Sequence, residues 1–382
     1  MIPAVLENWL GIRLFGYITF RAVACGMTAF LLALWWGQLT IRWLKANKVT
    51  EDLTKTDLVP LTREPGALSK RDTPTMGGSF LVAALIASVV LWGRLDNVHV
   101  ILAIVLTAGM AAVGFVDDFK KLTIPGSHGM SSTSKMIGLS VVVLGTLGAL
   151  VYYSSSAGRD TLLNIYPPFF NKLVIPLGTW GVLGAVIFVA FQWLVVVGTA
   201  NAANFTDGLD GLAAGCMIIS GVALGVFCYV SGRFDWTGYL NLPHVAAASE
   251  MAVVAAGLCG ACMGFLWYNA YPAKVFMGDS GSLPIGGLLA WLALVSKQEL
   301  VLPLIGCVFF ISLGSSWLQT FYYRRSGGQR VFTCAPLHHG LERHGGVFVA
   351  GAAPWHEVTV VVRFWIIAAV GAMASLALLK VR

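Results

Sequence analysis

The sequence predicts an all-α polytopic membrane protein with about ten transmembrane helices, because its composition and its regularly spaced apolar runs favour that fold class. Of the 382 residues, 57% are hydrophobic and only 11% are charged, whereas a soluble domain usually carries about 25% charged residues. The mean hydropathy is +0.77. A membrane helix needs about 20 apolar residues, so ten helices would occupy about 200 of them. The composition therefore excludes an ordinary soluble enzyme.

Apolar runs interrupted by polar or glycine-rich segments define the expected spans, and we expect residues 1–382 to form a single integral membrane domain. The spans are 15–37, 76–93, 98–116, 136–153, 179–198, 211–231, 248–267, 282–297, 301–320 and 358–379. An even number of spans places both termini on the same side of the membrane. The loops on the other side are 38–75, 117–135, 199–210, 268–281 and 321–357.

These five loops hold 15 of the 25 lysines and arginines, so the positive-inside rule predicts that they are cytoplasmic. The formal net charge of +7 says little by itself, because in a membrane protein the location of the charges matters more than their sum. We expect no nucleic acid partner. The longest loop on the opposite side, 154–178, is expected to hold a short strand pair or an interfacial turn. Arg21 and Arg363 fall within expected spans near their ends, where we expect a structural role with the charged head snorkelling to the interface.

The second of these loops opens with Asp117-Asp118-Phe-Lys-Lys121 directly after an apolar span. If the helix continues, Lys121 lies four residues after one aspartate and three after the other, so it neighbours both. Adjacent carboxylates suit a divalent cation, because Mg²⁺ prefers oxygen ligands. A solvated helix end is the alternative interpretation of this motif alone.

Two further loops carry polar residues with interspersed glycines. Asn201, Asn204, Asp207 and Asp210 recur at every third position, and the glycines at 208 and 211 indicate that the helix does not continue regularly. Such polar residues between spans favour a functional site. Residues 276–281 read Phe-Met-Gly-Asp-Ser-Gly; glycine amides beside a carboxylate can contact a phosphate and its metal, whereas a serine protease site lacks its structural context.

The first and last of these loops add basic groups. Lys70 precedes Thr73-Pro-Thr-Met-Gly-Gly78, and Arg324, Arg325 and Arg330 precede Pro336-Leu-His338-His339-Gly340. Without cysteine partners the histidines favour phosphate contacts over zinc. Together the loops offer carboxylates for a metal, cations for phosphates and an aromatic ring for a base, beside a membrane. That combination predicts transfer between a nucleotide-linked donor and a lipid acceptor.

From about residue 70 to the segment that follows Arg363, these motifs in this order resemble the phospho-N-acetylmuramoyl-pentapeptide transferases. The resemblance implies ten membrane helices, a homodimer, Mg²⁺ as cofactor, and synthesis of lipid I in the bacterial cytoplasmic membrane with the active site facing the cytoplasm. In that reaction phospho-MurNAc-pentapeptide moves from UDP-MurNAc-pentapeptide to undecaprenyl phosphate, and UMP is released.

The resemblance also implies roles for individual residues. Asp279 would be the Mg²⁺ ligand, and Phe276 would stack on uracil. The implied catalytic residues are Asp117, Asp118, Asp279, Lys121 and Lys135. The implied substrate-binding residues are Lys70, Thr75, Asn204, Asp207, Asp210, Asn269, Phe276, Gln319, His338 and His339.

The chain departs from the family pattern where a third consecutive histidine is usual. Gly340 stands there, and His344 follows four residues later. Ala67 also replaces a usual histidine three residues before Lys70, and residues 345–355 form a longer segment than usual before the last span.

Two other functions remain open from the sequence. A polyprenyl-phosphate N-acetylhexosamine-1-phosphate transferase would share the aspartate motifs, although Pro336-Leu-His-His339 and Thr73–Gly78 favour the muramoyl enzyme. A secondary transporter would place its polar residues near the bilayer midplane, often in repeated halves. This chain instead concentrates them at one surface and shows no repeat.

Overall fold

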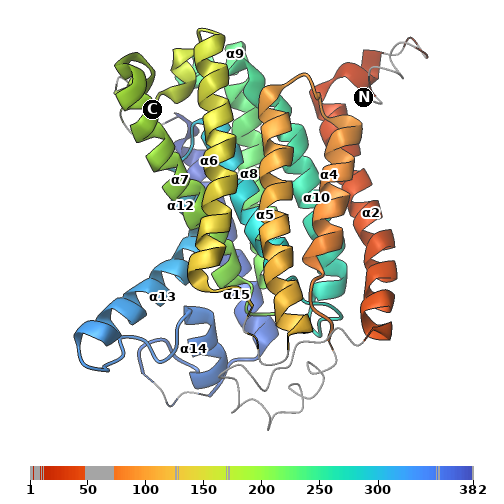
Figure 1. Ribbon diagram of the computed structural model, residues 1–382, viewed down its shortest axis with the longest axis vertical. Coiled ribbons are helices and arrows are strands. Elements are labelled where there is room, and N and C mark those ends of the chain that lie inside the picture. The colour runs from red at the N-terminus through yellow and green to blue at the C-terminus, as the bar shows by residue number, and fades with distance from the viewer. Residues whose placement is uncertain are drawn as a thin grey trace.

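The computed structural model describes residues 13–47, 73–124, 129–168, 173–349 and 353–380, with isolated positions at 3, 9, 11, 127, 170 and 351. Within these residues the fold is a bundle of helices (Figure 1). Its longest helices are α2 (Ile18–Ala46), α4 (Gly78–Trp92), α5 (Val98–Thr123), α6 (Ser132–Ser156), α7 (Gly181–Thr206), α8 (Leu212–Ser231), α10 (Met251–Asn269), α11 (Asp279–Ser296), α13 (Cys307–Arg325) and α15 (Glu357–Ala377).

Eight helical segments of the described part are long and apolar enough to cross a membrane, and α4 is a shorter apolar helix of 15 residues. Helices suit this environment because each satisfies its own backbone hydrogen bonds in the absence of water. The prediction of an all-α polytopic membrane protein is confirmed. That residues 1–382 form one integral membrane domain stays a prediction.

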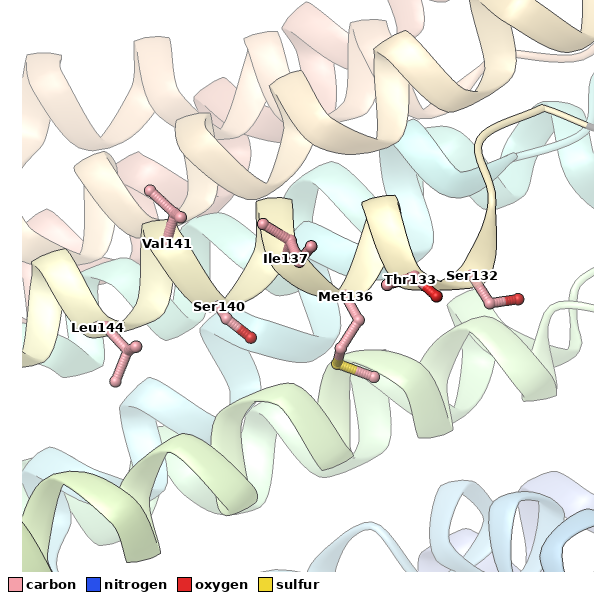
Figure 2. A pocket seen from close by; sticks show the side chains of 7 residues that line it. All are labelled: Ser132, Thr133, Met136, Ile137, Ser140, Val141 and Leu144. Atoms are coloured by element: carbon pink, nitrogen blue, oxygen red, sulfur yellow. The ribbon is translucent and has the colours of Figure 1, made fainter.

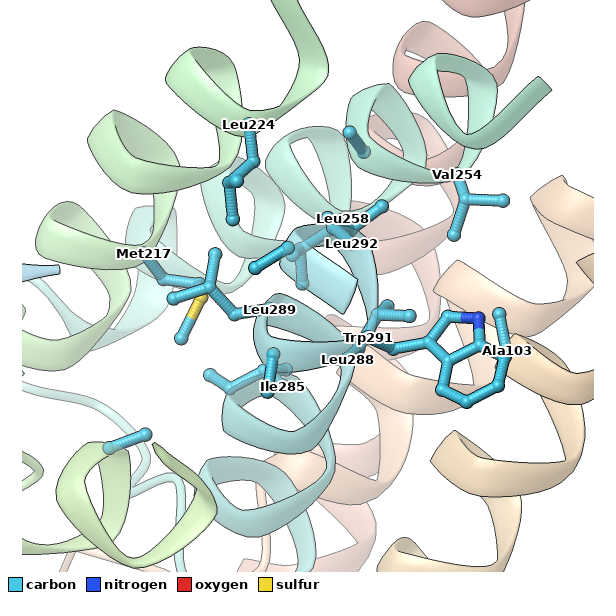
Figure 3. Close-up of a cluster of buried hydrophobic side chains, with 14 of the residues drawn as sticks. Ala103, Met217, Leu224, Val254, Leu258, Ile285, Leu288, Leu289, Trp291 and Leu292 are labelled. Atoms are coloured by element: carbon cyan, nitrogen blue, oxygen red, sulfur yellow. The ribbon is translucent and has the colours of Figure 1, made fainter. Parts of the chain in front are cut away.

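Helix α11 lies at the centre of the bundle, and every one of its residues is buried. It packs against α5, α7 and α8. Figure 3 shows Leu288, Leu289 and Leu292 of α11 among apolar side chains of α5, α8 and α10. The Trp291 indole nitrogen donates to the carbonyl of His99 at 3.1 Å, so even the polar atom of this large side chain is satisfied. Helix α11 is therefore the central helix against which α5, α7 and α8 pack.

Each expected span contains a helix, but several helices continue beyond the predicted end. Helix α5 continues to Thr123 and α7 to Thr206, whereas their spans were predicted to end at 116 and 198. Polar side chains terminate an apolar run without breaking a helix, which explains the difference. The aspartates at 117 and 118 therefore lie on a helix, and regular helix ends just before the glycine at 208, as expected.

Span 301–320 is divided into α12 (Leu302–Ile305) and α13, which are separated at Gly306. Helix α13 leaves the bundle at an angle, and near it lies α14 (Leu337–His344), a short helix that the sequence did not indicate (Figure 1). A second short helix, α9 (Phe234–Leu240), was also not predicted. In loop 154–178, where a short strand pair or an interfacial turn was expected, Ile165 and Ile175 form an isolated antiparallel bridge that does not extend into strands.

We expected Arg21 to snorkel to the interface, but its side chain is only 3% exposed and does not do so. It forms two hydrogen bonds with the Glu250 carboxylate, of 2.7 and 2.6 Å. The buried partner removes the need to reach water, and the bond joins α2 to the segment that leads into α10. The structural role predicted for Arg363 is consistent with its position, 4.0 Å from the centre of the Trp355 ring.

Replacing Arg21 tests this buried ion pair. Arg21→Met leaves the Glu250 carboxylate buried without a partner, so we expect the free energy of unfolding to fall by about 3–5 kcal/mol. Thermal unfolding in detergent measures the change. The matched control is Arg94→Met, which opens an ion pair with Asp96 whose side chains are 61% and 65% exposed and should alter stability little. Equal losses in the two variants would contradict the interpretation.

Candidate active site

The site begins where α5 approaches the N-terminal end of α11. A Cβ atom on Gly114 would lie 2.2 Å from the carbonyl oxygen of Asp279, so only glycine permits this approach. Gly278, directly before α11, has a φ of +71° and adopts a turn that side chains disfavour. Gly78 of α4 lies equally close to the backbone of Gly281. Three glycines thus allow three segments to meet at one point.

This close approach brings together Asp117, Asp118 and Asp279. One carboxylate oxygen of each lies within 4.8 Å of those of the others, and all three residues are buried. Among the described residues this is the group of acidic, histidine and cysteine side chains close enough to hold a metal ion. Two of its members come from α5 and the third from α11, which is 161 residues further along the chain than Asp118.

Asp118 binds the N-terminus of α11 directly. Its two carboxylate oxygens accept hydrogen bonds from the backbone nitrogens of Asp279, at 3.1 Å, and Ser280, at 2.9 Å. These amides have no partner within their own helix, and the positive end of the helix dipole favours the carboxylate. Asp117 accepts from the backbone nitrogen of Met130 at 2.7 Å. Asp118 therefore positions the third aspartate, and Asp117 holds the segment before α6.

Two lysines face the three carboxylates. The Lys121 ammonium lies 2.7 Å from Asp117, 3.5 Å from Asp118 and 3.4 Å from Asp279, which confirms that this lysine neighbours both aspartates of its helix. Lys135, in the first turn of α6, also pairs with Asp279. Two ammonium groups thus face three carboxylates, and the excess negative charge favours a further cation.

Asn204 completes the surroundings of Asp279. Its amide nitrogen donates to Asp279 Oδ1 at 2.6 Å and to the Ser282 hydroxyl at 2.9 Å. The sequence predicted the asparagine but missed Ser282, which lies at the expected start of a span and looked like part of its apolar run. The structure therefore brings together Asn204 and all five residues expected to be catalytic.

The loop from 207 to 211, between α7 and α8, is clamped from several sides. Asp210 Oδ2 accepts from the backbone nitrogen of Ala273 at 3.0 Å, and the Asp210 nitrogen donates to Glu357 at 2.8 Å. Asn269 accepts from Gly211 at 3.0 Å and donates to the carbonyl of Val275 at 2.9 Å. Asp210 and Asn269, both expected to bind substrate, thus join this loop to the loop between α10 and α11. No sequence pattern pointed to Glu357, which precedes the last apolar run.

Phe276 lies in the loop between α10 and α11. Its backbone nitrogen donates to Pro74 and its carbonyl accepts from Gly77, both at 2.8 Å, so the segment before α4 pairs with the segment before α11. The Phe276 side chain is half-buried and Thr75 is buried. Lys70 lies outside the described residues.

The two histidines lie at the start of α14 with their rings 4.5 Å apart. His338 is fully buried and neither ring nitrogen has a partner. Burial, followed by the charges of His339 and Arg343, lowers the pKa of His338 well below its usual value. A Cβ atom on Gly208 would lie 2.8 Å from Nε2 of each ring, which places both histidines against the loop that contains Asp207 and Asp210.

Gln319 of α13 contacts the backbone of the loop that precedes α14. Its side-chain oxygen accepts from the backbone nitrogens of Val331 and Phe332, both at 3.0 Å. It therefore shapes the loop that leads to α14.

A groove of about 450 Å³ follows one face of α6 (Figure 2). It is lined by Ser132, Thr133, Met136, Ile137, Ser140, Val141 and Leu144. Met136, Ile137, Val141 and Leu144 are exposed on a membrane-spanning helix, which is an apolar surface suited to lipid. The groove begins in the same helical turn as Lys135.

The fold and the site define an integral membrane glycosyl transferase, because the sequence pattern of the family described as "Glycosyl transferase family 4" matches residues 100–297. That region is just over half of the chain and contains the three aspartates. A phospho-N-acetylmuramoyl-pentapeptide-transferase of Neisseria gonorrhoeae is 41% identical over 382 residues, and one of Neisseria meningitidis serogroup C is 40% identical. Each alignment covers 99% of both chains. The chain belongs to the phospho-N-acetylmuramoyl-pentapeptide-transferase family, which confirms the resemblance.

The family's third histidine has no room at position 340 in this fold. A Cβ atom on Gly340 would lie 2.9 Å from the Thr333 hydroxyl, which is held by bonds to the carbonyls of Gly346, at 2.7 Å, and Val347, at 3.2 Å. An imidazole there would displace this segment. His344 is the last residue of α14, one turn later.

Gly340→Ala tests this packing. We expect it to lower the melting temperature, because the added methyl group displaces the bonded Thr333 hydroxyl, at a cost of about 1–3 kcal/mol for overpacking. The control is Gly314→Ala in α13, where no atom lies within 4 Å of an added Cβ and alanine favours the helix by about 0.5–1 kcal/mol. If both variants melted alike, Gly340 would not be required by packing.

Proposed function

We propose that the cluster of Asp117, Asp118 and Asp279, faced by Lys121 and Lys135, is the active site at which this chain makes lipid I. The chain transfers phospho-MurNAc-pentapeptide from UDP-MurNAc-pentapeptide to undecaprenyl phosphate and releases UMP. The buried carboxylates within 4.8 Å of one another carry the assignment, since a membrane protein retains such charges only where they have a use.

The cofactor that fits this cluster is Mg²⁺. The donors are all carboxylate oxygens, which hard cations prefer, and the cluster has one negative charge more than the lysines neutralise. Asp279 would be its principal ligand, with Asp117 and Asp118 beside it. When bound, the ion neutralises charge on the pyrophosphate.

The lysines bind the phosphates of the two substrates. The ammonium groups of Lys121 and Lys135 both contact Asp279. They therefore lie beside the carboxylates, where the substrate phosphates would bind. The lipid phosphate is a monoester with a second pKa of about 6, so it is already largely dianionic at neutral pH. We therefore favour direct in-line attack over a phosphorylated aspartate. Asp117 orients the acceptor or takes its remaining proton.

The donor lies along two loops, the loop from 207 to 211 and the loop between α10 and α11 that contains Phe276. Phe276 offers an aromatic face for uracil, and Asp210 with Asn269 maintains the loops around it. Thr75, Asn204, Asp207, Gln319, His338 and His339 shape the rest of the donor site, together with Lys70. The apolar groove on α6 (Figure 2) accommodates the polyprenyl chain, since it begins in the same helical turn as Lys135 and its apolar side chains are exposed on a membrane-spanning helix.

The protein is a multi-pass membrane protein. We propose that this site faces the cytoplasm in the bacterial cytoplasmic membrane, and the excess of lysines and arginines in the loops on this side supports that orientation. We further propose that the chain works as a homodimer, as the family resemblance implies.

The direct test is UMP release by detergent-purified protein with undecaprenyl phosphate, with and without Mg²⁺. We expect release from UDP-MurNAc-pentapeptide and none from UDP-GlcNAc, because the family is defined by the muramoyl donor. Asp279→Asn should abolish release, since it removes the proposed metal ligand. Arg94→Met, which changes only an exposed ion pair, serves as the active control. Release from UDP-GlcNAc alone would assign the chain to the N-acetylhexosamine-1-phosphate transferases instead.

A further inference from the structure

Glu342 contacts one of the two site histidines, although neither the motifs nor the family resemblance pointed to it. Its carboxylate oxygen Oε2 lies 2.9 Å from Nδ1 of His339, three residues earlier on α14. Residues three apart on a helix share a face, so the pair is built into the helix itself. Both side chains are mostly buried, which protects the contact from competition with water.

The other nitrogen of His339 faces the proposed donor site. Nε2 lies 2.8 Å from the position of a Cβ on Gly208, in the loop that carries Asp207 and Asp210. A carboxylate on Nδ1 fixes the orientation of an imidazole and determines which nitrogen is available at the other side. Glu342 therefore directs Nε2 of His339 toward the clamped loop.

His338 provides an internal contrast. It is adjacent in sequence and its Nε2 lies against the same glycine, but no carboxylate contacts it and it is fully buried. Burial keeps His338 neutral, as the lowered pKa indicates. Neighbouring imidazoles with such different surroundings serve different purposes.

We propose that Glu342 is a positioning residue that fixes the ring of His339, so that its Nε2 contacts a polar group of the donor's UDP. This inference rests on the proposed function, because it assumes that the loop at Gly208 borders the donor site. The carboxylate on Nδ1 restrains rotation of the ring, so Glu342 keeps Nε2 directed at the donor.

A double-mutant cycle on UMP release tests the proposal. Glu342→Gln keeps the size of the side chain but removes its charge, and we expect kcat/KM for the UDP-linked donor to fall about 10- to 100-fold, the effect expected for losing one hydrogen bond to a charged group. The loss should lie in the donor KM, with the KM for undecaprenyl phosphate unchanged. In a His339→Asn background the same change should cost less than about twofold, because its effect passes through the ring. Glu342→Asp, which retains the charge, should recover part of the loss.

The outcomes separate this role from a structural one. Independent losses that multiply in the double variant, or equal increases in both KM values, would overturn the proposal. Asp96→Asn, which removes the carboxylate of an exposed pair with Arg94, is the matched control and should leave both constants unchanged.

A binding measurement keeps the inference distinct from the proposed function. UDP should raise the melting temperature of the wild-type protein and raise that of Glu342→Gln much less. If the wild-type protein released no UMP from the muramoyl donor, the proposed function would fail while this comparison still tested the pair. Equal protection by UDP in both proteins would refute the inference.

Discussion

The approach of α5 to the first turn of α11 is the contact on which the rest of the site depends. The Gly114 backbone lies against Asp279, while the Asp118 carboxylate binds the two amides that begin α11. Steric fit and electrostatics thus act at the same point, since the free amides and the helix dipole favour a negative group there. Because every residue of α11 is buried, the orientation of Asp279 is fixed by the core of the protein.

Burying several charges at the end of a membrane bundle opposes folding, so their arrangement requires compensation. Lys121 and Lys135 neutralise part of the charge, and Asn204 satisfies a further carboxylate oxygen. Elsewhere in the bundle a buried charge is fully neutralised by one partner, as where Arg21 pairs with Glu250. The incomplete balance at the three aspartates is what distinguishes a binding site from a structural ion pair.

The sequence predicted the fold well because apolar runs report directly on membrane spans. Asp117, Asp118 and Lys121 were also accessible, since their spacing on one helix is local information. The internal roles of Asn269 and Asp210 were not, because each contacts backbone atoms from a distant loop. Glu357 was missed for the same reason. Glu342 was missed although His339 is only three residues away, because the short helix α14 was not predicted. The lack of room at Gly340 depends on Thr333, which no periodicity reveals. Sequence patterns located the site, whereas the partners of each side chain required the fold.

The central claim is that the contact between α5 and α11 creates a single divalent cation site. The most direct measurement is the affinity for Mn²⁺, as a paramagnetic substitute for Mg²⁺, by electron paramagnetic resonance in wild type and Gly114→Ala. This variant keeps every carboxylate but separates the two helices, so binding should weaken roughly 10- to 100-fold. Gly145→Ala, where an added Cβ meets no atom within 4 Å, should bind as the wild type does. Unchanged affinity in Gly114→Ala would contradict the account.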